Sequence, residues 1–517
     1  MIDQDGLHTL GRWTRDRAAT TPRRIAVDDR GVLLKYADLD ARASALATGF
    51  RAAGYLIGDR IATITGNSSD QIVLFFACAK AGLVLVPLSW RLSPRELADQ
   101  LTIADPMLLL VEDEFTTLAR AATARLIAPL SSTALGSQGV EQSVPAREYR
   151  VGDRREPRVI EDDDPLLIIF TSGTLGRAKG VVLTHANCFW TNLSLSRTAE
   201  ITSSDVVLSV MPQYHVGGWN IQPLLAWWAG ATVVLERTFD AGRVLHLIAD
   251  RGITTIMGVP TNYLLLAQHP DFETSDLSTL NHAIVGGAPM PAPLLRIWHA
   301  RGVQLTQGYG LTEASPNVLC LPDEDARTRA GSSGKPYPHV EVVLANPVTG
   351  EFVEGAGSGE LLVRGPAIFG GYFRAPVETA AALQDGWLHT GDLVSRDDEG
   401  YYTVIDRIKD IFITGGESVA PTEIEEVLFG HPAVADVGVV GVPSERWGEV
   451  PVAWVVVRLG EATDEHDLLE FAARSLARFK VPDRIMFTTE IPRSSGNKVL
   501  RRILLERWNA GSVELAR

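Results

Sequence analysis

Residues 166–185 read LLIIFTSGTLGRAKGVVLTH, an apolar strand pattern followed by a loop rich in hydroxyl groups and glycines. The polar and small residues of this loop are Thr171, Ser172, Gly173, Thr174, Gly176, Lys179 and Gly180. Backbone N–H and hydroxyl groups in such a loop converge on an anion, and Lys179 adds a positive charge. The Walker A pattern GxxxxGK[ST] is absent, and a second strand-like segment follows. We therefore predict an anion-binding loop between two strands, although a glycine-rich surface hairpin also fits this segment alone.

Short apolar runs separated by helical stretches extend on both sides of the loop, up to about residue 340. The runs include RIATIT, LVLVPL, PMLLLVED, TVVLE, ITTIMGVP and HAIVGGAP. Strands that alternate with amphipathic helices are typical of parallel sheets built from βαβ units. In FFACAKAGLVLVPL, a helix is expected to end at Gly82 before a buried strand begins. Residues 129–160 are polar and irregular, and we interpret them as a surface excursion.

The pattern changes after residue 340. The closely spaced runs VEVVLA, GELLVRG, WLHTGD and YYTVID predict a small antiparallel β unit at residues 341–406. Mixed helix and strand patterns follow to the end of the chain. The predicted fold is therefore α/β: a large N-terminal domain at 1–408, with parallel-rich sheets, helices and the small β unit, and a smaller, mobile α+β domain at 409–517.

The segment IDRIKD, residues 405–410, lies at this boundary and has alternating charges and little to bury. A short charged link can act as a hinge if few contacts cross it, although an ordinary interdomain turn fits it equally well.

The composition limits the class of protein. A chain of 517 residues exceeds the size at which single cores stop growing. The net charge of −15 argues against a general nucleic-acid binder but not against a local anion site. Cys78, Cys188 and Cys320 form no CxxC pair, which argues against a disulfide framework and a cysteine zinc site. No transmembrane segment, signal peptide or peroxisomal signal is predicted, so we expect a cytoplasmic protein.

A second motif, QLTQGYGLTEASP, occupies residues 304–316. The ring of Tyr309 can stack on a flat heterocycle, Thr312 can donate to a phosphate oxygen, and Glu313 is a hard oxygen ligand suited to Mg²⁺. Taken alone, the motif also fits a strand-to-turn junction with a buried tyrosine.

Weaker motifs accompany these two. HAIVGGAPM places small residues, Gly286, Gly287 and Ala288, at the end of a strand, where a ring can approach closely. WLHTGD ends in Asp392, whose carboxylate can accept from a ribose diol, and DRIKD offers Arg407 as a phosphate or ribose donor.

The last motif, IPRSSGNKVLRR, holds a lysine on a flexible turn near the end of the chain. Domain motion can deliver such a side chain into a cleft, although by itself Lys498 also fits a solvated surface lysine.

Together, FTSGTLGRAKG, GYGLTEA, HTGD, the DRIKD–TGGE–EIEEVL stretch and PRSSGNK resemble the adenylate-forming superfamily of acyl-CoA synthetases, luciferases and nonribosomal adenylation domains, in order and in spacing. The resemblance spans essentially the whole chain and is greatest to bacterial-type fatty-acid or aryl acid–CoA ligases. It implies an ATP-dependent enzyme that converts a fatty, medium-chain or aryl acid to acyl-AMP with release of pyrophosphate, and then transfers the acyl group to coenzyme A.

The resemblance also implies roles in nucleotide binding. The 171–180 loop would hold the β- and γ-phosphates, and Asp392 would bind the ribose hydroxyls with Arg407 nearby. Thr312 would contact the α-phosphate, and Glu313 would ligate Mg²⁺. Lys498 would bridge the substrate carboxylate and the α-phosphate. The residues framing the adenine and the adjacent backbone are Gly287, Ala288, Gly308 and Tyr309.

Two further implications concern domain motion and the loop. Lys409 falls where the family has its hinge, and Gly415, Gly416 and Glu417 would face the pantetheine tunnel after rotation. The family loop usually reads TSGTTGxPKG, and here Leu175 and Ala178 replace a threonine and a proline. Leu175 removes a hydroxyl group that would face the phosphates, and Ala178 removes a rigid turn. These two changes put the tightness of ATP binding in doubt, and the activity less so.

The segment MPQYHVGGWN, residues 211–220, resembles the acyl-pocket segment of the family. No acidic residue is present to pair with an α-amine, which argues against an amino-acid substrate. His215 resembles an aromatic gate, with a structural histidine as the alternative, and Trp219 would either shorten the pocket or move aside for a long chain. The expected pocket residues are Tyr214, His215, Gly218, Trp219, Gly286 and Gly310.

Several alternatives stay open. The acceptor is predicted to be coenzyme A, in part because ERWGEVPVAWVV resembles CoA ligases; a stand-alone ligase that loads a carrier protein is the second choice. A non-catalytic nucleotide- or acyl-binding homologue and a luciferase-like oxidation are minor alternatives. Homodimer formation and peripheral membrane contact are undetermined, as are the acid and its pathway.

Overall fold

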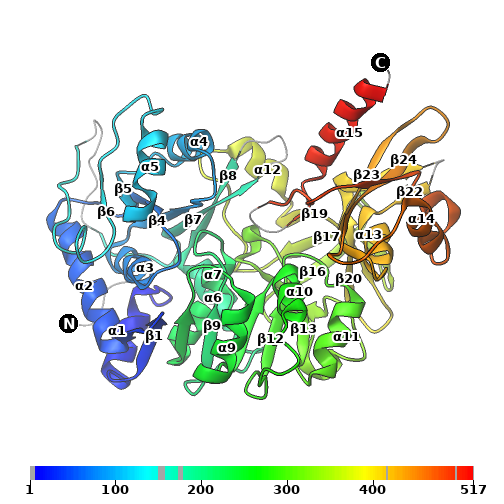
Figure 1. The fold of residues 1–517 in the computed structure, drawn as a ribbon. Helices are drawn as coiled ribbons and strands as arrows, with labels where there is room; N and C mark the ends of the chain where they lie inside the picture. The colour runs from blue at the N-terminus through cyan, green and yellow to red at the C-terminus, as the bar shows by residue number, and fades with distance from the viewer. Residues whose placement is uncertain (1–5, 150–157, 173–177, 415–416, 495–497, 516–517) are drawn as a thin grey trace.

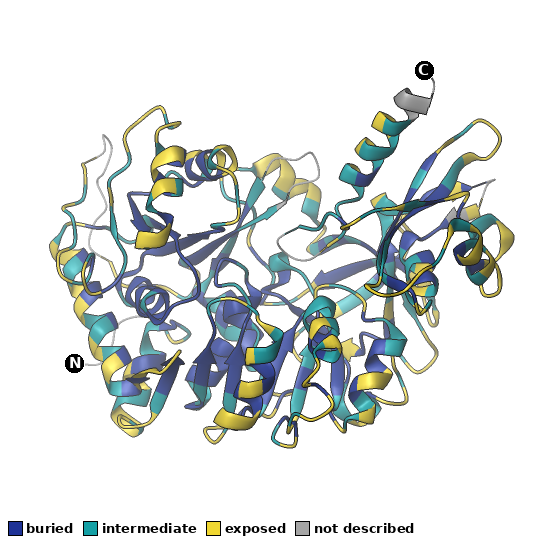
Figure 2. Cartoon of the chain, viewed as in Figure 1, coloured by how far each residue is buried: buried dark blue, intermediate teal, exposed yellow. Residues whose placement is uncertain are grey.

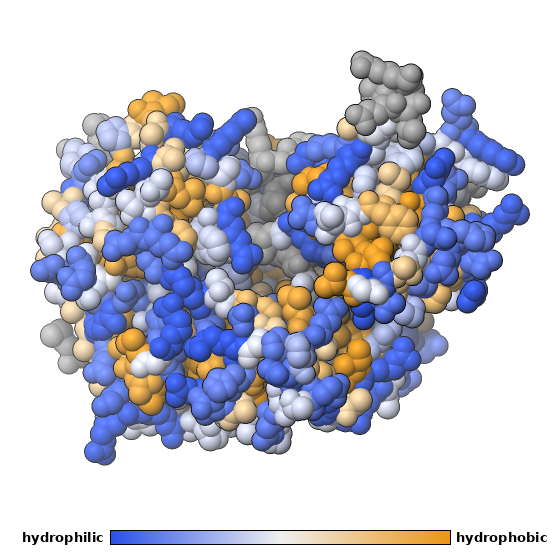
Figure 3. Space-filling model, in the orientation of Figure 1, coloured by the Kyte–Doolittle hydropathy of each residue, from blue (hydrophilic) through white to orange (hydrophobic). Residues whose placement is uncertain are grey.

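The computed structural model describes residues 6–149, 158–172, 178–414, 417–494 and 498–515. A large part of the molecule carries three sheets, coloured blue to yellow in Figure 1, and a smaller C-terminal part, orange to red, lies beside it. The predicted fold class, a large α/β part with a small β unit followed by a smaller α+β part, is therefore confirmed. Figure 3 shows the surface hollowed between the part that carries the six-stranded sheet and the C-terminal part.

The strands flanking the predicted anion-binding loop belong to a six-stranded sheet in the order β6-β5-β3-β4-β7-β8. Neighbours are parallel except β7 and β8, which are antiparallel. The strands are β3 (Arg60–Ile64), β4 (Val84–Leu88), β5 (Leu108–Val111), β6 (Ser132–Ala134), β7 (Pro165–Ser172) and β8 (Ala178–Thr184). Because β6 pairs with β5, the prediction that residues 129–160 are irregular throughout is wrong: three residues extend the sheet edge there.

A nine-stranded sheet has the order β15-β14-β13-β12-β11-β9-β10-β1-β2 and is parallel from β13 to β1. Its strands are β1 (Ile25–Asp29), β2 (Val32–Lys35), β9 (Val206–Ser209), β10 (Thr232–Leu235), β11 (Thr255–Gly258), β12 (His282–Val285), β13 (Leu305–Gly310), β14 (Asn317–Cys320) and β15 (Lys335–Pro336). Ligands of such sheets bind beyond the carboxyl ends of the parallel strands, where the predicted motifs lie.

The small β unit is antiparallel, as predicted. Its strands are β16 (Glu341–Ala345), β17 (Gly357–Arg364), β18 (Leu383–Gln384), β19 (Trp387–Arg396) and β20 (Tyr402–Arg407). The C-terminal sheet is mostly antiparallel and comprises β21 (Phe412–Thr414), β22 (Glu417–Val419), β23 (Val434–Ser444), β24 (Gly448–Val457) and β25 (Arg484–Phe487).

The helices lie between and outside the sheets (Figure 1). They are α1 (Gly11–Thr20), α2 (Tyr36–Ala52), α3 (Ser69–Ala81), α4 (Pro94–Ala104), α5 (Thr116–Thr123), α6 (His185–Leu195), α7 (Gly217–Asn220), α8 (Pro223–Ala229), α9 (Ala241–Arg251), α10 (Pro260–Gln268), α11 (Ala292–Ala300), α12 (Pro376–Ala382), α13 (Pro421–Phe429), α14 (Glu465–Ala473) and α15 (Arg501–Leu515). As predicted, α3 ends at Gly82, whose φ of 72° is left-handed and is readily adopted by glycine.

The hydrophobic core of the N-terminal part joins its two large sheets. One cluster contains Ile61 and Leu85 from the six-stranded sheet, Val27 and Val233 from the nine-stranded sheet, and much of α3. The C-terminal part has separate clusters of its own. Figure 2 shows the buried strands and helices that these clusters occupy. The C-terminal part therefore has an independent core, which is a condition for moving as a unit. No helix within the described ranges has the length and hydropathy needed to cross a bilayer.

Candidate active site

A cavity of about 570 Å³ lies beyond the carboxyl ends of β11, β12 and β13. Its wall includes Gly286 and Gly287 after β12 and Gly308 and Gly310 in β13. A Cβ atom on Gly310 would lie 1.7 Å from the carbonyl oxygen of Pro316, so no larger residue fits there. Small residues at these strand ends leave room for a ligand, as predicted from the two motifs.

One end of the cavity is polar and is organised by Asp392, whose residue is 5% exposed. The hydroxyl group of Tyr309 donates to Asp392 Oδ2, and Arg407 Nε lies 3.1 Å from Oδ1. Burial and the neighbouring carboxylate raise the pKa of the Tyr309 hydroxyl well above its usual value, so it stays a donor. The carboxylate is therefore held in one orientation next to the cavity wall formed by Tyr309 and Arg407.

Thr312 and Glu313 follow β13 in a short 3-10 helix, η2 (Thr312–Ala314), and both line the cavity. The carboxylate of Glu313 accepts a hydrogen bond from the hydroxyl of Tyr372 at 2.8 Å. Lys179 Nζ lies 4.8 Å from the centre of the same tyrosine ring, a cation–π distance. Tyr372 thus connects the strand after the predicted anion-binding loop to the predicted metal ligand.

The anion-binding loop is only partly described. Thr171 lines the cavity, and Ser172 ends β7, where only its backbone is described. Ala178 begins β8, as expected of a loop between two strands. The remaining predicted residues, Gly173, Thr174, Leu175 and Gly176, lie outside the described residues.

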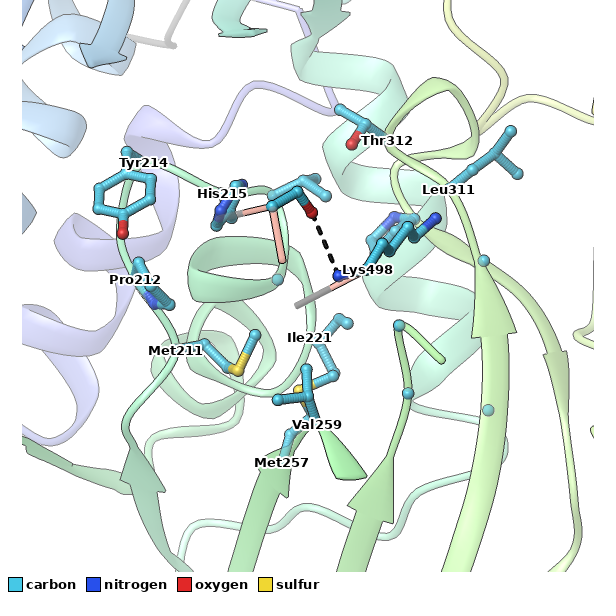
Figure 4. Close-up of a pocket in the computed structure, with 18 of the residues that line it drawn as sticks. Met211, Pro212, Tyr214, His215, Ile221, Met257, Val259, Leu311, Thr312 and Lys498 are labelled. Carbon is cyan, nitrogen blue, oxygen red and sulfur yellow. Dashed lines mark hydrogen bonds between the residues drawn. The ribbon is translucent and has the colours of Figure 1, made fainter. Parts of the chain in front are cut away.

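Lys498 reaches the cavity from the C-terminal part of the chain, where it lines the wall together with Ser494. The backbone N–H of Lys498 donates to Ser494 Oγ at 3.2 Å, the contact dashed in Figure 4. Lys498 is exposed as a residue, but the atoms packed around its ammonium group desolvate it, and this together with the positive charge of Arg407 lowers its pKa to about 8. The structure therefore brings Lys498 together with Thr312, Glu313 and Arg407, residues that are distant in sequence.

The other end of the cavity is apolar. Figure 4 shows the side chains around it: Met211, Pro212, Tyr214, His215, Ile221, Met257, Val259 and Leu311. The rings of Tyr214 and His215 meet at 4.8 Å with an interplanar angle of 60°. Among the described residues, the buried Tyr214 hydroxyl has no hydrogen-bond partner.

Several predicted residues do not line this cavity: Lys179, Asp392, Gly218, Trp219, Ala288, Lys409 and Glu417. A Cβ on Gly218 would lie 2.4 Å from the carbonyl oxygen of Pro212, so this glycine permits a close backbone approach. Trp219 is fully buried, stacks on Phe75 at 4.7 Å and donates from Nε1 to the Gln213 carbonyl. The expectation that Trp219 limits or gates the pocket is therefore wrong, because α7 directs its ring into the main core. Ala288 is half-buried and only its neighbour Gly287 reaches the wall.

The predicted hinge residue Lys409 is exposed in a short 3-10 helix, η4 (Ile408–Asp410), between the two parts. On its N-terminal side, the buried Asp406 Oδ2 accepts from the backbone and the hydroxyl of Thr422, both at 3.1 Å. Glu417 is exposed at the start of β22 and does not line the cavity, and Gly415 and Gly416 lie outside the described residues.

Sequence reasoning missed Tyr372. Its signal is modest, a tyrosine after two glycines in FGGYFR, and it gains meaning only because the 365–373 segment packs along β8. The backbone contacts that fix it are Val182 N–H to the Gly371 carbonyl and Phe373 N–H to the Gly180 carbonyl.

Comparison with known proteins gives two family matches. Residues 14–373 match the model of the AMP-binding enzyme, and residues 423–498 match the AMP-binding enzyme C-terminal domain. The chain is 38% identical to a feruloyl-CoA synthase of an Amycolatopsis species, over 95% of this chain and 97% of the relative. It is 36% identical to the fatty acid–[acyl-carrier-protein] ligase ScoC of Streptomyces coeruleorubidus, over 97% of each chain.

A solved structure is similar over nearly the whole chain. It is O-succinylbenzoate coenzyme A synthetase from Bacillus subtilis in complex with ATP and magnesium ion, with a TM-score of 0.84 and 29% identity. The match covers 96% of this chain and 99% of that one.

Proposed function

The chain belongs to the AMP-binding enzyme family, and on this basis we propose that it is an ATP-dependent acid–CoA ligase. In the first half-reaction, the substrate carboxylate attacks the α-phosphorus of ATP and pyrophosphate leaves, which gives acyl-AMP. In the second, the thiol of coenzyme A attacks the acyl carbon and AMP leaves. A free carboxylate is a poor acyl donor because its leaving group would be oxide, whereas AMP is a good leaving group.

The observation that carries this proposal is the meeting of Lys498 with Thr312, Glu313 and Arg407 around one cavity that has a polar and an apolar end. Bringing a carboxylate to ATP is opposed by charge repulsion of roughly 1–4 kcal/mol for each close pair. A lysine between the two anions offsets this repulsion at the reacting atoms. We therefore assign Lys498 to the bridge between the carboxylate and the α-phosphate, and Thr312 to the α-phosphate.

The nucleotide is assigned to the polar end. Tyr309 and Gly287 would frame the adenine, and Asp392, oriented by Tyr309 and Arg407, would accept from the ribose hydroxyls. Thr171 and Lys179 would hold the outer phosphates.

The donor set fits Mg²⁺ bound mainly through substrate oxygens. Among the described residues, no group of three or more His, Cys, Asp or Glu side chains could hold a metal alone, but Glu313 presents a carboxylate to the cavity. Mg²⁺ commonly takes one or two carboxylates together with substrate phosphates. When bound, the ion would neutralise phosphate charge, and the relative solved with ATP and magnesium ion supports the assignment.

The second half-reaction requires a different arrangement. In the pose described, Lys498 lines the cavity and Glu417 does not. We propose that the C-terminal part, with its own core, rotates about Lys409 so that the acyl-AMP becomes accessible to the thiol of coenzyme A.

We propose that the acid carries an aryl group. The side chains around the apolar end are mainly those of Met, Pro, Ile, Val and Leu residues, which favour contact with an apolar ring. Two arginines outside the polar end also line the cavity: Arg237, which is paired with Glu112 and Glu114, and Arg91, whose guanidinium lies 5.1 Å from the centre of the Trp90 ring. Because a cavity of about 570 Å³ must also hold the nucleotide, a compact ring fits better than a long alkyl chain. Feruloyl, the acyl group in the name of one relative, contains a ring.

The decisive assay measures pyrophosphate and AMP formation over a panel of aryl, medium-chain, long-chain and dicarboxylic acids. Each acid is tested with coenzyme A and, separately, with a holo-carrier protein. AMP turnover that requires coenzyme A supports the ligase; turnover only with the carrier supports the second candidate, a carrier-loading ligase, which the likeness to ScoC favours. The absence of pyrophosphate release with every acid would contradict both functions.

A further inference from the structure

The strand that carries Asp392 contains a bulge, and Asp392 is the last residue of that bulge. The register of β17 on β19 shifts between Glu360 and Leu362, so that one residue of β17 lies opposite residues 390–392 of β19. Gly391, in the middle of the bulge, has φ 69°, in the left-handed region. Bulges of this kind bend a strand and redirect a side chain, and they occur next to active sites.

Glu360 holds this bulge with both of its carboxylate oxygens. Oε1 accepts a hydrogen bond from the backbone N–H of Gly391 at 3.0 Å, and Oε2 lies 3.0 Å from His389 Nδ1. The Glu360 side chain is only 15% exposed. In the strand pairing, Glu360 lies opposite Leu393, but its carboxylate reaches back to Gly391 and His389. One carboxylate therefore spans the distorted segment.

A second tether comes from inside the bulge. The hydroxyl of Thr390 donates to the Leu361 carbonyl at 2.7 Å and accepts from the backbone N–H of Asp392 at 3.1 Å. The backbone of Asp392 is thereby tied to β17, while its carboxylate is turned to Tyr309 and Arg407. Glu360 itself does not line the cavity.

We propose that Glu360 is a positioning residue for nucleotide recognition: by fixing the 389–391 backbone, it aims the Asp392 carboxylate at the ribose hydroxyls. The proposal rests on the function proposed above, which assigns the ribose to Asp392. Without the Glu360 carboxylate, the Gly391 N–H loses its acceptor in a partly buried site, and the left-handed turn is free to relax. Asp392 keeps its charge in that case but loses its fixed direction.

Ribose discrimination provides a test that general destabilisation would not mimic. The kcat/KM of pyrophosphate release is measured with ATP, 2′-deoxyATP and 3′-deoxyATP for the wild type, Glu360→Ala and Glu360→Gln. A hydrogen bond to a carboxylate makes the wild type prefer ATP over at least one deoxy analogue by about tenfold or more. In Glu360→Ala this preference should fall below about threefold, through a higher KM for ATP. Glu360→Gln should keep the preference, because an amide oxygen still accepts from Gly391 and the amide N–H donates to the other tautomer of His389.

Glu341→Ala is the matched control, because Glu341 lies in the same sheet and pairs with Arg364 on the surface. It should discriminate like the wild type. Glu360→Asp, which keeps the charge but is too short to reach both partners, covers the case in which the alanine variant does not fold. Wild-type discrimination in whichever of these two variants folds would overturn the positioning role. A wild type that does not discriminate at all would instead overturn the assignment of Asp392.

Discussion

The hydroxyl group of Tyr309 donates a hydrogen bond to Oδ2 of Asp392 at 2.5 Å. Tyr309 lies near the end of β13 and Asp392 lies in β19, so this contact joins the nine-stranded sheet to the small β unit at the edge of the cavity.

The first prediction follows from this contact. Tyr309→Phe keeps the ring against the proposed adenine site but leaves Asp392 without its neutral donor. The loss of a hydrogen bond to a charged group predicts a KM for ATP about tenfold higher or more, with a smaller change in kcat. Steady-state pyrophosphate release at saturating acid measures both. Tyr401→Phe, which removes a surface hydrogen bond to Asp325, is the control; an equal KM in both variants would contradict the proposed role.

Lys498→Ala should reduce adenylation by about 10²-fold or more, by analogy with the removal of one preorganised transition-state donor. The same variant should convert preformed acyl-AMP and coenzyme A to thioester at nearly the wild-type rate, because the lysine then has no bridging task. Single-turnover assays separate the two half-reactions. Lys480→Ala, at an exposed ion pair with Glu423 in the same part of the chain, is the control. Equal losses in both half-reactions would refute the assignment.

The pH dependence of adenylation should report Lys498. Burial and Arg407 lower the pKa of its ammonium group to about 8 in the substrate-free protein. The charged form is the one that pairs with two anions, so kcat/KM should be level below about pH 8 and fall up to tenfold per unit above it. The bound acid and nucleotide are anions and favour the charged form of Lys498. The fall of kcat should therefore begin at a higher pH than the fall of kcat/KM. In Lys498→Arg, the fall of kcat/KM above about pH 8 should be absent. If the fall is unchanged in this variant, it reports the titration of another group.

Tyr372→Phe should weaken Mg²⁺-dependent nucleotide binding. The variant keeps the ring next to Lys179 but removes the hydroxyl that orients Glu313. Loss of an outer partner of a metal ligand typically costs about tenfold or more in metal affinity. Calorimetric titration of ATP at a series of Mg²⁺ concentrations measures the half-saturating Mg²⁺ without turnover. If only thermal stability changes, the tyrosine is a packing residue.

Two glycines form a matched pair at the acid pocket. Gly218→Ala should lower the melting temperature, because its Cβ would meet the backbone of Pro212 at 2.4 Å. Gly286→Ala should leave stability nearly unchanged, because its Cβ meets the flexible Met257 side chain at 3.3 Å. The second variant should instead disfavour the bulkier acids of the panel, since Gly286 lines the cavity. Differential scanning fluorimetry measures the stability of both variants, and the acid panel measures their substrate preference. A change of acid preference in Gly218→Ala without a loss of stability would instead place Gly218 in the pocket wall.

The sequence was a reliable guide where a residue's place follows from the end of a strand. Tyr309, Glu313 and Gly286 lie at the carboxyl ends of parallel strands, and the spacing of apolar runs predicts those ends. The end of a helix at Gly82 is predicted for a similarly local reason, because the left-handed conformation after a helix favours glycine.

Long-range packing limited the prediction elsewhere. Trp219 is close in sequence to His215, but its ring direction depends on Phe75, far earlier in the chain. The role of Tyr372 depends on three segments meeting, β8, η2 and its own loop, and no periodicity records such a meeting. The short strand β6 is defined by its pairing with β5 rather than by its own polar sequence.

The division of the cavity wall has an evolutionary consequence. Among the described residues, the C-terminal part contributes only Ser494 and Lys498 to the wall, and the apolar end belongs entirely to the N-terminal part. Substitutions that alter the choice of acid are therefore expected within residues 1–408, whereas the C-terminal part supplies the lysine proposed to bridge the carboxylate and the α-phosphate. Recombination near codon 409 would then join the acid pocket of one relative to the bridging lysine of another, and leave the lining of the apolar end unchanged.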